Sequence, residues 1–412
     1  MRCRHCDAEL NLPFIDLGAA PLSNAYLTEH SLRTPEKWYP LRVFVCTNCW
    51  LVQTEDYDYA GKLFSADYAY FSSFSTFWLA HAEHYVSAMV KRFGLSSDSH
   101  VVEVASNDGY LLQYVKQRGI PCLGIEPTAS TASAARLKGI ETLEEFFCVS
   151  LAKKLVHQDK QADLLVANNV LAHVSDINDF VRGCALLLKP QGIATFEFPH
   201  LMQLIEHKQF DTIYHEHFSY LSFSTVDQIF RENGLAVFDV EELGTHGGSL
   251  RVFAQRTNTG KYLFSENVTK LIDRETADGM RSVAYYQGFQ EQADKVKNDL
   301  LVFLLEAKCQ GKAVAAYGAA AKGNTLLNYA GVRPDLLAYV VDKNPNKQGK
   351  YLPGSRIPIV DEVHLRDKRP NYVVILPWNL KTEVMEQLSY IRDWGGVFVT
   401  AVPVLDVMEA GT

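Results

Sequence analysis

Buried strands and amphipathic helices alternate through the middle of the chain. The apolar run VVEVA at 101–105 is typical of a strand buried on both faces, and an amphipathic helix follows it after a short turn. PCLGIEP indicates a second strand that ends at Glu126, and further strands are expected at 164–167 and after the glycine turn of LKPQG. A helix at 224–232 precedes AVFDVEELGTHGGSLRVFAQR, which predicts two strands with a glycine-rich connection. This order predicts an α/β, doubly wound parallel sheet closed by an antiparallel hairpin.

A second unit of the same kind is expected between about residues 280 and 405. KAVAAYGAAAKGNTLLNYAG has the pattern of a strand, a glycine turn and a helix, and LLAYVVDKNP indicates a second strand that ends at Asp342. NYVVILPWNL and GGVFVTAVPV supply further apolar strands. We therefore predict three domains: a small N-terminal domain (1–70), a central α/β domain (71–258) and a C-terminal Rossmann-like α/β domain (259–412).

Composition narrows the class of protein. The 412 residues are 47% hydrophobic, which is enough apolar material for sizeable cores. The formal net charge of −8 argues against a nucleic-acid partner, since such proteins usually carry a basic surplus. The N-terminus has no apolar segment of the secretory type, and no apolar run approaches the roughly 20 residues that span a bilayer. We expect a cytoplasmic protein, monomeric or a small homo-oligomer, with no membrane partner.

Two CxxC pairs lie near the start of the chain, with 39 residues between them. Four thiolates from two such pairs can surround Zn²⁺ as a closed tetrahedron, which is the form of a structural site. A redox role for the pairs is the alternative, but neither opens a helix after a strand. The sequence predicts a structural zinc ion on Cys3, Cys6, Cys46 and Cys49.

The turn after the first central strand indicates a cofactor without phosphates. It reads SNDG and holds one glycine, whereas dinucleotide folds use GxGxxG to approach a pyrophosphate. Glu126 follows Asn107 by 19 residues, about the distance at which a second strand delivers a carboxylate to a ribose. EVASNDGYLL resembles motif I of class I methyltransferases, and LKPQG resembles their LKPGG turn, although such turns also occur in plain α/β folds. The expected S-adenosylmethionine (SAM) ligands are Glu103, Ser106, Asn107, Gly109, Glu126, Asn168, Asn169 and Phe71.

The glycine turn of the C-terminal unit resembles a phosphate loop. Gly318 and Gly323 have the right separation, but Lys322 precedes the second glycine instead of following it. We interpret the turn as a diphosphate cradle at a helix N-terminus, with Lys322 as the cation. The nearby cations Lys350 and Arg356 also favour an anionic ligand. A second fold used for packing alone is the alternative, and the missing GxGxxG argues against an NAD enzyme.

The whole chain resembles the nucleotide-diphosphate-sugar 3-C-methyltransferases of deoxysugar biosynthesis. The likeness is carried by CRHC and CTNC, DYAYFSSFS, EVASNDGYLL, NNVLAHV, FEFPHL, DTIYHEHFSYLS, GTHGGSLR and YGAAAKGNTLLNY. It implies SAM-dependent methylation of carbon 3 of a 4-keto deoxysugar on a nucleoside diphosphate, with dTDP as the expected carrier. The substrate-binding residues expected on this basis are Lys322, Asn324, Gly318, Tyr351 and Arg251.

The resemblance also gives the segment YHEHFSY at 214–220 a role as the proton-transfer site. A histidine with a pKa near 6.5 is a usable base near neutral pH, and donors must stabilise the resulting enolate. The implied base is His217, although the residues alone would allow His215 to exchange roles with it. The expected catalytic residues are His217, Tyr214, Glu216, His173 and Tyr68.

Other readings of this segment remain open. It could be structural or interfacial, and His215 with His217 could hold a metal, although further ligands at clear spacing are lacking. His246 in GTHGGSLR suits either polar packing or contact with substrate. O- or N-methylation on the same scaffold, or a non-catalytic nucleotide-binding protein, are the alternatives for the whole chain.

Overall fold

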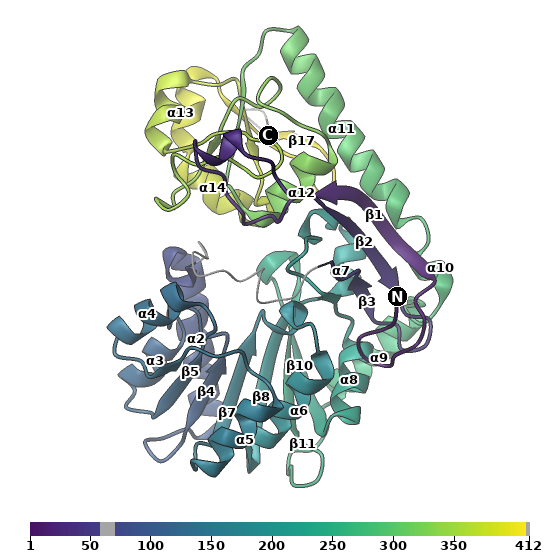
Figure 1. Cartoon of the computed structure of the whole chain (residues 1–412), viewed down its shortest axis with the longest axis vertical. Helices are drawn as coiled ribbons and strands as arrows, with labels where there is room; N and C mark the ends of the chain where they lie inside the picture. The colour runs from purple at the N-terminus through teal and green to yellow at the C-terminus, as the bar shows by residue number, and fades with distance from the viewer. Residues whose placement is uncertain (58–70, 409–412) are drawn as a thin grey trace.

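A computed structural model describes residues 1–57 and 71–408. The described chain folds around three sheets, and Figure 1 shows the central unit below, the C-terminal unit above, and the N-terminal strands beside both. Within this described part, no helix is of a kind that could cross a lipid bilayer. The predicted α/β architecture is confirmed.

The central sheet has seven strands in the order β10-β11-β8-β7-β4-β5-β6. All neighbours are parallel except that β11 runs antiparallel to both β8 and β10. The strands are β4 (Val101–Val104), β5 (Cys122–Ile125), β6 (Thr142–Leu143), β7 (Ala162–Asn168), β8 (Leu188–Pro199), β10 (Leu235–Leu243) and β11 (Ser249–Arg256). The expected hairpin is therefore present and closes the parallel sheet.

Most helices of the central unit cover this sheet. The helices of this unit are α2 (Thr76–Phe93), α3 (Leu112–Gln117), α4 (Ala129–Leu137), α5 (Val149–His157), α6 (Ile177–Leu187), α7 (Leu201–Glu206), α8 (Phe223–Glu232) and α9 (Glu266–Ala277). Ser75, Asp176 and Ser222 begin α2, α6 and α8, and each side chain accepts a hydrogen bond from a first-turn amide. One expectation was wrong: KPQG is not a separate turn, because β8 already begins at Leu188 and passes through it with a register shift.

The N-terminal sheet has the order β1-β2-β3-β9 and is antiparallel. It comprises β1 (Leu12–Ala20), β2 (Tyr39–Val45), β3 (Val52–Thr54) and β9 (Ser219–Tyr220). The last strand belongs to the YHEHFSY segment, and Tyr220 pairs with Val52 across the ladder. The N-terminal domain is thus joined by backbone hydrogen bonds to the segment with the expected catalytic residues.

The C-terminal sheet has the order β14-β13-β12-β15-β16-β17, in which β17 alone is antiparallel to its neighbour. Its strands are β12 (Val314–Tyr317), β13 (Val340–Val341), β14 (Ile359–Val360), β15 (Tyr372–Ile375), β16 (Val397–Thr400) and β17 (Asp406–Met408). The helices are α10 (Val283–Tyr286), α11 (Phe289–Cys309), α12 (Ala321–Tyr329), α13 (Glu362–Lys368) and α14 (Lys381–Gln387).

One hydrophobic core joins the N-terminal sheet to the C-terminal unit. The ring of Phe14 in β1 stacks on Phe289 of α11 at a centroid distance of 4.5 Å, and Trp50 stacks on Tyr286 at 6.0 Å. Figure 1 shows α11 running along β1. Aromatic pairs of this kind contribute about 0.5–1.5 kcal/mol beyond their buried area. The N-terminal sheet therefore spans the junction between the two α/β units.

Candidate active site

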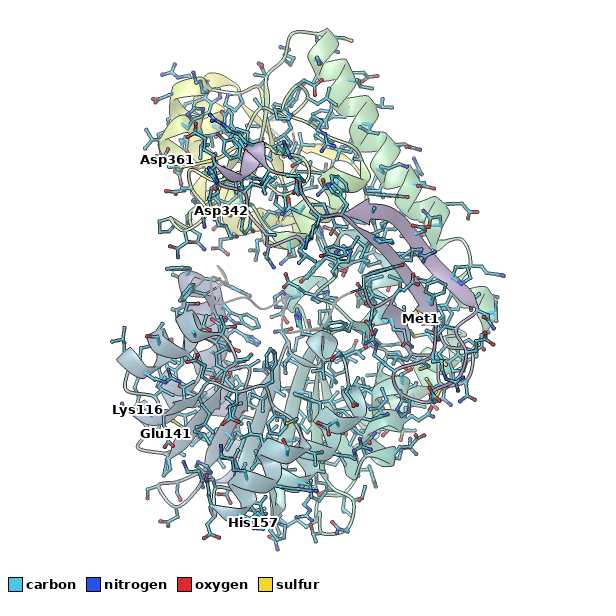
Figure 2. All side chains as sticks on the ribbon, in the orientation of Figure 1. Met1, Lys116, Glu141, His157, Asp342 and Asp361 are labelled. Carbon is cyan, nitrogen blue, oxygen red and sulfur yellow. The ribbon has the colours of Figure 1, made fainter. Side chains whose placement is uncertain are left out.

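A cavity of about 670 Å³ lies where the three parts of the chain meet. Asn24 reaches it from the N-terminal domain, and Lys322 and Lys347 reach it from the C-terminal unit. The central unit supplies the rest of the wall, at the carboxyl ends of its parallel strands, where ligands bind in open α/β sheets. Figure 2 places Asp342 on the side of the C-terminal unit that faces the central unit. Glu141 lies at the outer edge of the central unit, away from the C-terminal unit.

The turn after β4 forms one end of the cavity. Asn107 has a φ of +49°, and its backbone N–H donates to Glu126 Oε2 at 2.9 Å. The other carboxylate oxygen accepts from the Thr128 amide at 3.0 Å. Gly109 has a φ of +74°, and a Cβ there would lie 2.4 Å from Ile140 Cδ1, so this position requires glycine. The turn and the acid are thus fixed to one another before any ligand binds.

Glu126 is 5% exposed and faces the cavity. Burial raises the pKa of this carboxyl group, and the amides of Thr128 and Asn107 offset part of that effect. Each carboxylate oxygen already accepts one hydrogen bond from a backbone amide, and each can accept a further hydrogen bond from a hydroxyl group. A ribose diol fits that requirement.

The expected cofactor residues divide into two groups. Asn107, Glu126, Asn168 and Asn169 line the cavity. The other four expected residues do not line the cavity: Ser106, Gly109, Glu103 and Phe71. Glu103 is 1% exposed within β4, and burial raises its pKa well above the ordinary value.

Glu126→Ala is expected to weaken SAM binding by roughly 1–3 kcal/mol, the scale of hydrogen bonds to a charged acceptor. Calorimetry with SAM measures this directly. Glu141→Ala is the matched control, since Glu141 pairs with Lys160 at the surface and its loss should leave the affinity unchanged. Equal affinities for the Glu126 variant and the unmodified enzyme would place the cofactor elsewhere.

His217 stands at the cavity wall in a defined tautomer. Its Nδ1 lies 2.8 Å from the Thr212 carbonyl oxygen, and its Nε2 lies 2.8 Å from the Tyr214 hydroxyl. A carbonyl oxygen can only accept, so Nδ1 carries the proton and Nε2 is the acceptor. Tyr214 therefore donates to Nε2, and both side chains line the cavity.

The backbone of the segment is held from both sides. Phe218 N–H donates to the Ala172 carbonyl at 2.8 Å, and Thr54 Oγ1 donates to the His217 carbonyl at 3.0 Å. Thr54 belongs to β3 of the N-terminal sheet. The backbone that carries the imidazole is thus held by two different domains.

Three imidazoles at this wall favour the neutral form. Burial lowers the pKa of His173 to about 4 and that of His246 to about 4. Burial also lowers the pKa of His217 well below its ordinary value, and His173, whose ring centroid is 4.6 Å away, adds to this. A neutral His217 is ready to accept a proton at neutral pH.

His215 does not share this position. Its Nε2 donates to the Pro40 carbonyl at 3.1 Å, and its ring meets the edge of Tyr39 at 5.9 Å, both in the N-terminal domain. The structure therefore separates the two histidines that the sequence left interchangeable. Glu216, 3% exposed, lines the cavity with His173, while Tyr68 falls outside the described residues.

The N-terminus of α12 forms the opposite end of the cavity. Ala320, Ala321 and Lys322 line it, and alanine at the N-cap position offers no side chain to cap the first-turn amides. Gly318 begins the turn with a φ of +90°, and a Cβ there would lie 2.5 Å from Pro377 Cδ. Free amides at a helix N-terminus favour an anion.

Two lysines add positive charge at this end. Lys322 Nζ donates to Asn379 Oδ1 at 2.7 Å and lies 4.7 Å from the Trp378 ring centroid. Burial lowers the pKa of Lys322, and the buried Asp211 partly offsets that effect. Lys347 Nζ donates to the Ala319 carbonyl at 2.8 Å and lies 3.5 Å from Asp342. The cavity therefore has a cationic end opposite the Glu126 end.

Of the expected substrate-binding residues, Lys322 lines the cavity, and Gly318 allows the turn that leads into α12. Asn324 lies in α12, where its Nδ2 donates to the Ser23 carbonyl at 2.6 Å. Tyr351 forms a backbone bridge with Leu27. Arg251 lies outside the lining, with Nη2 2.6 Å from Glu197 Oε1 and Nη1 3.0 Å from Glu241 Oε2.

The surrounding cations also differ from expectation. Arg356 is exposed and lies 3.6 Å from Glu36, away from the cavity, and Lys350 does not line it. Lys347, three residues before Lys350, lines the cavity instead. Asn24 is a second residue that the sequence reading missed, because no motif marks it.

The four cysteines of the two CxxC pairs come together as expected. Their Sγ atoms all lie within 4.8 Å of one another, and the shortest separations are 3.5 Å. Sulfur ligands at about 2.3 Å from zinc would stand about 3.8 Å apart in a tetrahedron. The cluster fits a structural Zn²⁺ with no open position, and its cysteines are not part of the cavity lining.

The sheet order and the cofactor turn define a SAM-dependent methyltransferase fold. Residues 78–240 match the model of a methyltransferase domain, residues 3–64 that of a putative zinc binding domain, and residues 244–403 that of a C-methyltransferase C-terminal domain. The C-methyltransferase NovU of Streptomyces niveus is 31% identical over 408 residues, which cover 99% of this chain and 97% of that protein. The chain belongs to this family of C-methyltransferases.

Other similarities cover smaller parts of the chain. A ubiquinone biosynthesis O-methyltransferase of Bordetella avium is 33% identical over 98 residues, which are 23% of this chain and 41% of that protein. Among solved structures, the PH0226 protein of Pyrococcus horikoshii is 15% identical with a TM-score of 0.39, and the match covers 46% of this chain and 95% of that one.

Proposed function

We propose that this C-methyltransferase transfers the methyl group of SAM to carbon 3 of a 4-keto deoxysugar carried by a nucleoside diphosphate, most simply dTDP. One observation carries the proposal: a single cavity is lined by the Glu126 turn, by His217 and by Lys322. These three features suit a ribose, a carbon acid and a diphosphate, respectively.

The neutral imidazole supports a reaction that begins with proton removal. A hydrogen next to a ketone is a far weaker acid than imidazolium, so the base needs help from groups that stabilise the enolate. His217 Nε2 would take the proton from carbon 3, while the electrons of that C–H bond pass to the carbonyl oxygen as an enolate. The Tyr214 hydroxyl, released from Nε2 as that atom is protonated, would then donate to the enolate oxygen.

The methyl donor, when bound, supplies an electrophilic methyl group on a sulfonium. Carbon 3 of the enolate would form the new C–C bond as the S–CH₃ bond breaks, which would restore the ketone and leave S-adenosylhomocysteine. The protein's part in this step is to hold the two reactants in line, which can supply several kcal/mol of the rate enhancement. An O- or N-methyltransferase would not need the enolate donor, and membership of the C-methyltransferase family favours carbon as the acceptor.

The cationic end supports the nucleoside diphosphate. The first-turn amides of α12 and the ammonium groups of Lys322 and Lys347 converge on the cavity, and a diphosphate can accept from all of them. Asp342 accepts from the Ala319 amide at 2.8 Å and lies beside Lys347, so it helps to hold the cationic end of the cavity.

Lys322→Ala is expected to raise the KM for the sugar nucleotide about 10- to 100-fold, because hydrogen bonds to charged groups contribute about 1.5–3 kcal/mol. Steady-state kinetics and calorimetry with dTDP measure the effect, and the affinity for SAM should not change. Lys343→Ala is the control, since that exposed lysine lies outside the cavity lining. If the Lys322 variant instead lost SAM binding, the ligands would be assigned to the wrong ends.

A further inference from the structure

A short loop of the N-terminal domain, residues 22–27, reaches both ends of the acceptor site. Asn24 Nδ2 donates to Glu216 Oε1 at 2.7 Å, and both residues line the cavity. The direction of this hydrogen bond is fixed, because the amide nitrogen can only donate. Glu216 is 3% exposed, so its orientation depends on such partners and not on bulk water.

The loop is attached firmly to the C-terminal unit. The Ser23 carbonyl accepts from Asn324 Nδ2 at 2.6 Å, and the Tyr26 hydroxyl donates to the Ala319 carbonyl at 2.6 Å. Leu27 exchanges backbone hydrogen bonds with Tyr351. The carbonyl of Ala319 also accepts from Lys347, so the loop shares a partner with the cationic end of the cavity.

We propose that Asn24 is a positioning residue for the Glu216 carboxylate, through which the N-terminal domain takes part in the reaction. Asn24 holds Oε1 in place. Because residues 22–27 are fixed to the α12 turn, the carboxylate is set at a constant distance from the diphosphate site. This inference rests on the proposed function, in which Glu216 contacts the sugar.

Three variants test this role with SAM and the keto sugar nucleotide in the full-length, zinc-loaded protein. Asn24→Ala should lower kcat about 10- to 100-fold, the rate equivalent of one charged hydrogen bond, with KM changed by less than about threefold. Asn24→Asp should be worse than Asn24→Ala, although it is nearly isosteric, because it sets a second carboxylate against Glu216. Asn11→Ala is the control, an exposed asparagine of the same domain, and should match the unmodified enzyme.

The order of the two Asn24 variants separates positioning from packing, because a role in filling space predicts that Asp is milder than Ala. A rise in KM with kcat unchanged, or Asp milder than Ala, would overturn the inference. Glu216→Gln and the double variant Asn24→Ala/Glu216→Gln complete the cycle, and the double variant should lose little beyond Glu216→Gln alone. If Glu216→Gln is fully active, the role of Glu216 in the proposed function fails; if it is impaired and Asn24→Ala is not, only the role of Asn24 fails.

Discussion

His217→Asn is expected to lower the rate of methyl transfer by about 10²–10⁴-fold, the usual contribution of a general base. Asparagine can still donate to the Thr212 carbonyl that Nδ1 now contacts, so folding and the binding of both ligands should be retained. The proton acceptor, however, is gone. Exchange of deuterium into carbon 3, followed by NMR with S-adenosylhomocysteine in place of SAM, isolates the proton-transfer step, and this exchange should be lost in parallel.

His215→Asn is the internal control for this variant. His215 donates to Pro40 outside the cavity, so the change should reduce activity by at most a few-fold through the stability of the N-terminal contact. Normal exchange in the His217 variant with loss in the His215 variant would reverse the two roles. Normal exchange in both would move the base outside this segment.

The pH profile should follow the direction of the His217 pKa. Burial lowers that pKa, so the neutral, proton-accepting form persists below the ordinary histidine value of about 6.5. As pH falls through the lowered pKa, His217 becomes protonated and the rate falls. We therefore expect the acidic limb of kcat/KM to lie below about pH 6.5, and a limb above that value would contradict a buried histidine base.

Loss of the metal cluster is expected to have the second large effect. Cys49→Ser should release the one zinc ion expected per chain and abolish most activity, because structural zinc contributes about 10–16 kcal/mol of apparent binding free energy to small domains. The loop after β1 carries Asn24, and β3 pairs with β9 beside His217, so unfolding of the N-terminal domain disturbs the active site without any zinc chemistry. Elemental analysis and activity measured on the same preparation test both points.

Cys309→Ser is the matched control, since Cys309 is exposed at the end of α11. It should keep its zinc and its activity. Protein purified without chelator that holds no zinc would refute the metal assignment. A Cys49 variant that loses zinc but stays fully active would refute the link between the N-terminal domain and catalysis.

Regular elements of the fold could be predicted because they repeat a local pattern. The run Val101–Val104 is buried on both faces, and the hairpin of β10 and β11 follows directly from the sequence. The pairing of β9 with β3 could not be predicted, because a strand of two residues carries no periodicity and its partner is distant in sequence. The KPQG turn was misread because proline and glycine, which usually interrupt strands, here accompany a register shift at the start of β8.

Residues of the candidate site could be predicted where several reactive side chains lie close together in the sequence. Asn107 and Glu126, separated along the chain by a helix, meet as their spacing suggested, and YHEHFSY reaches the cavity through Tyr214, Glu216 and His217. Asn24 and Lys347 depend on how distant loops fold back, which no local pattern encodes. Arg251 could not be excluded from sequence, because its ion pairs with Glu197 and Glu241 arise from neighbouring strands.

The position of the transferred methyl group shows whether the enzyme methylates carbon. The enzyme would be incubated with ¹³C-methyl-labelled SAM and a dTDP-linked 4-keto-deoxysugar, and the product examined by NMR. We expect a labelled methyl group bonded to carbon 3, with the hydrogen of that carbon replaced and the ketone retained. A label on oxygen or nitrogen, or no transfer to any keto sugar nucleotide while SAM still binds, would contradict it.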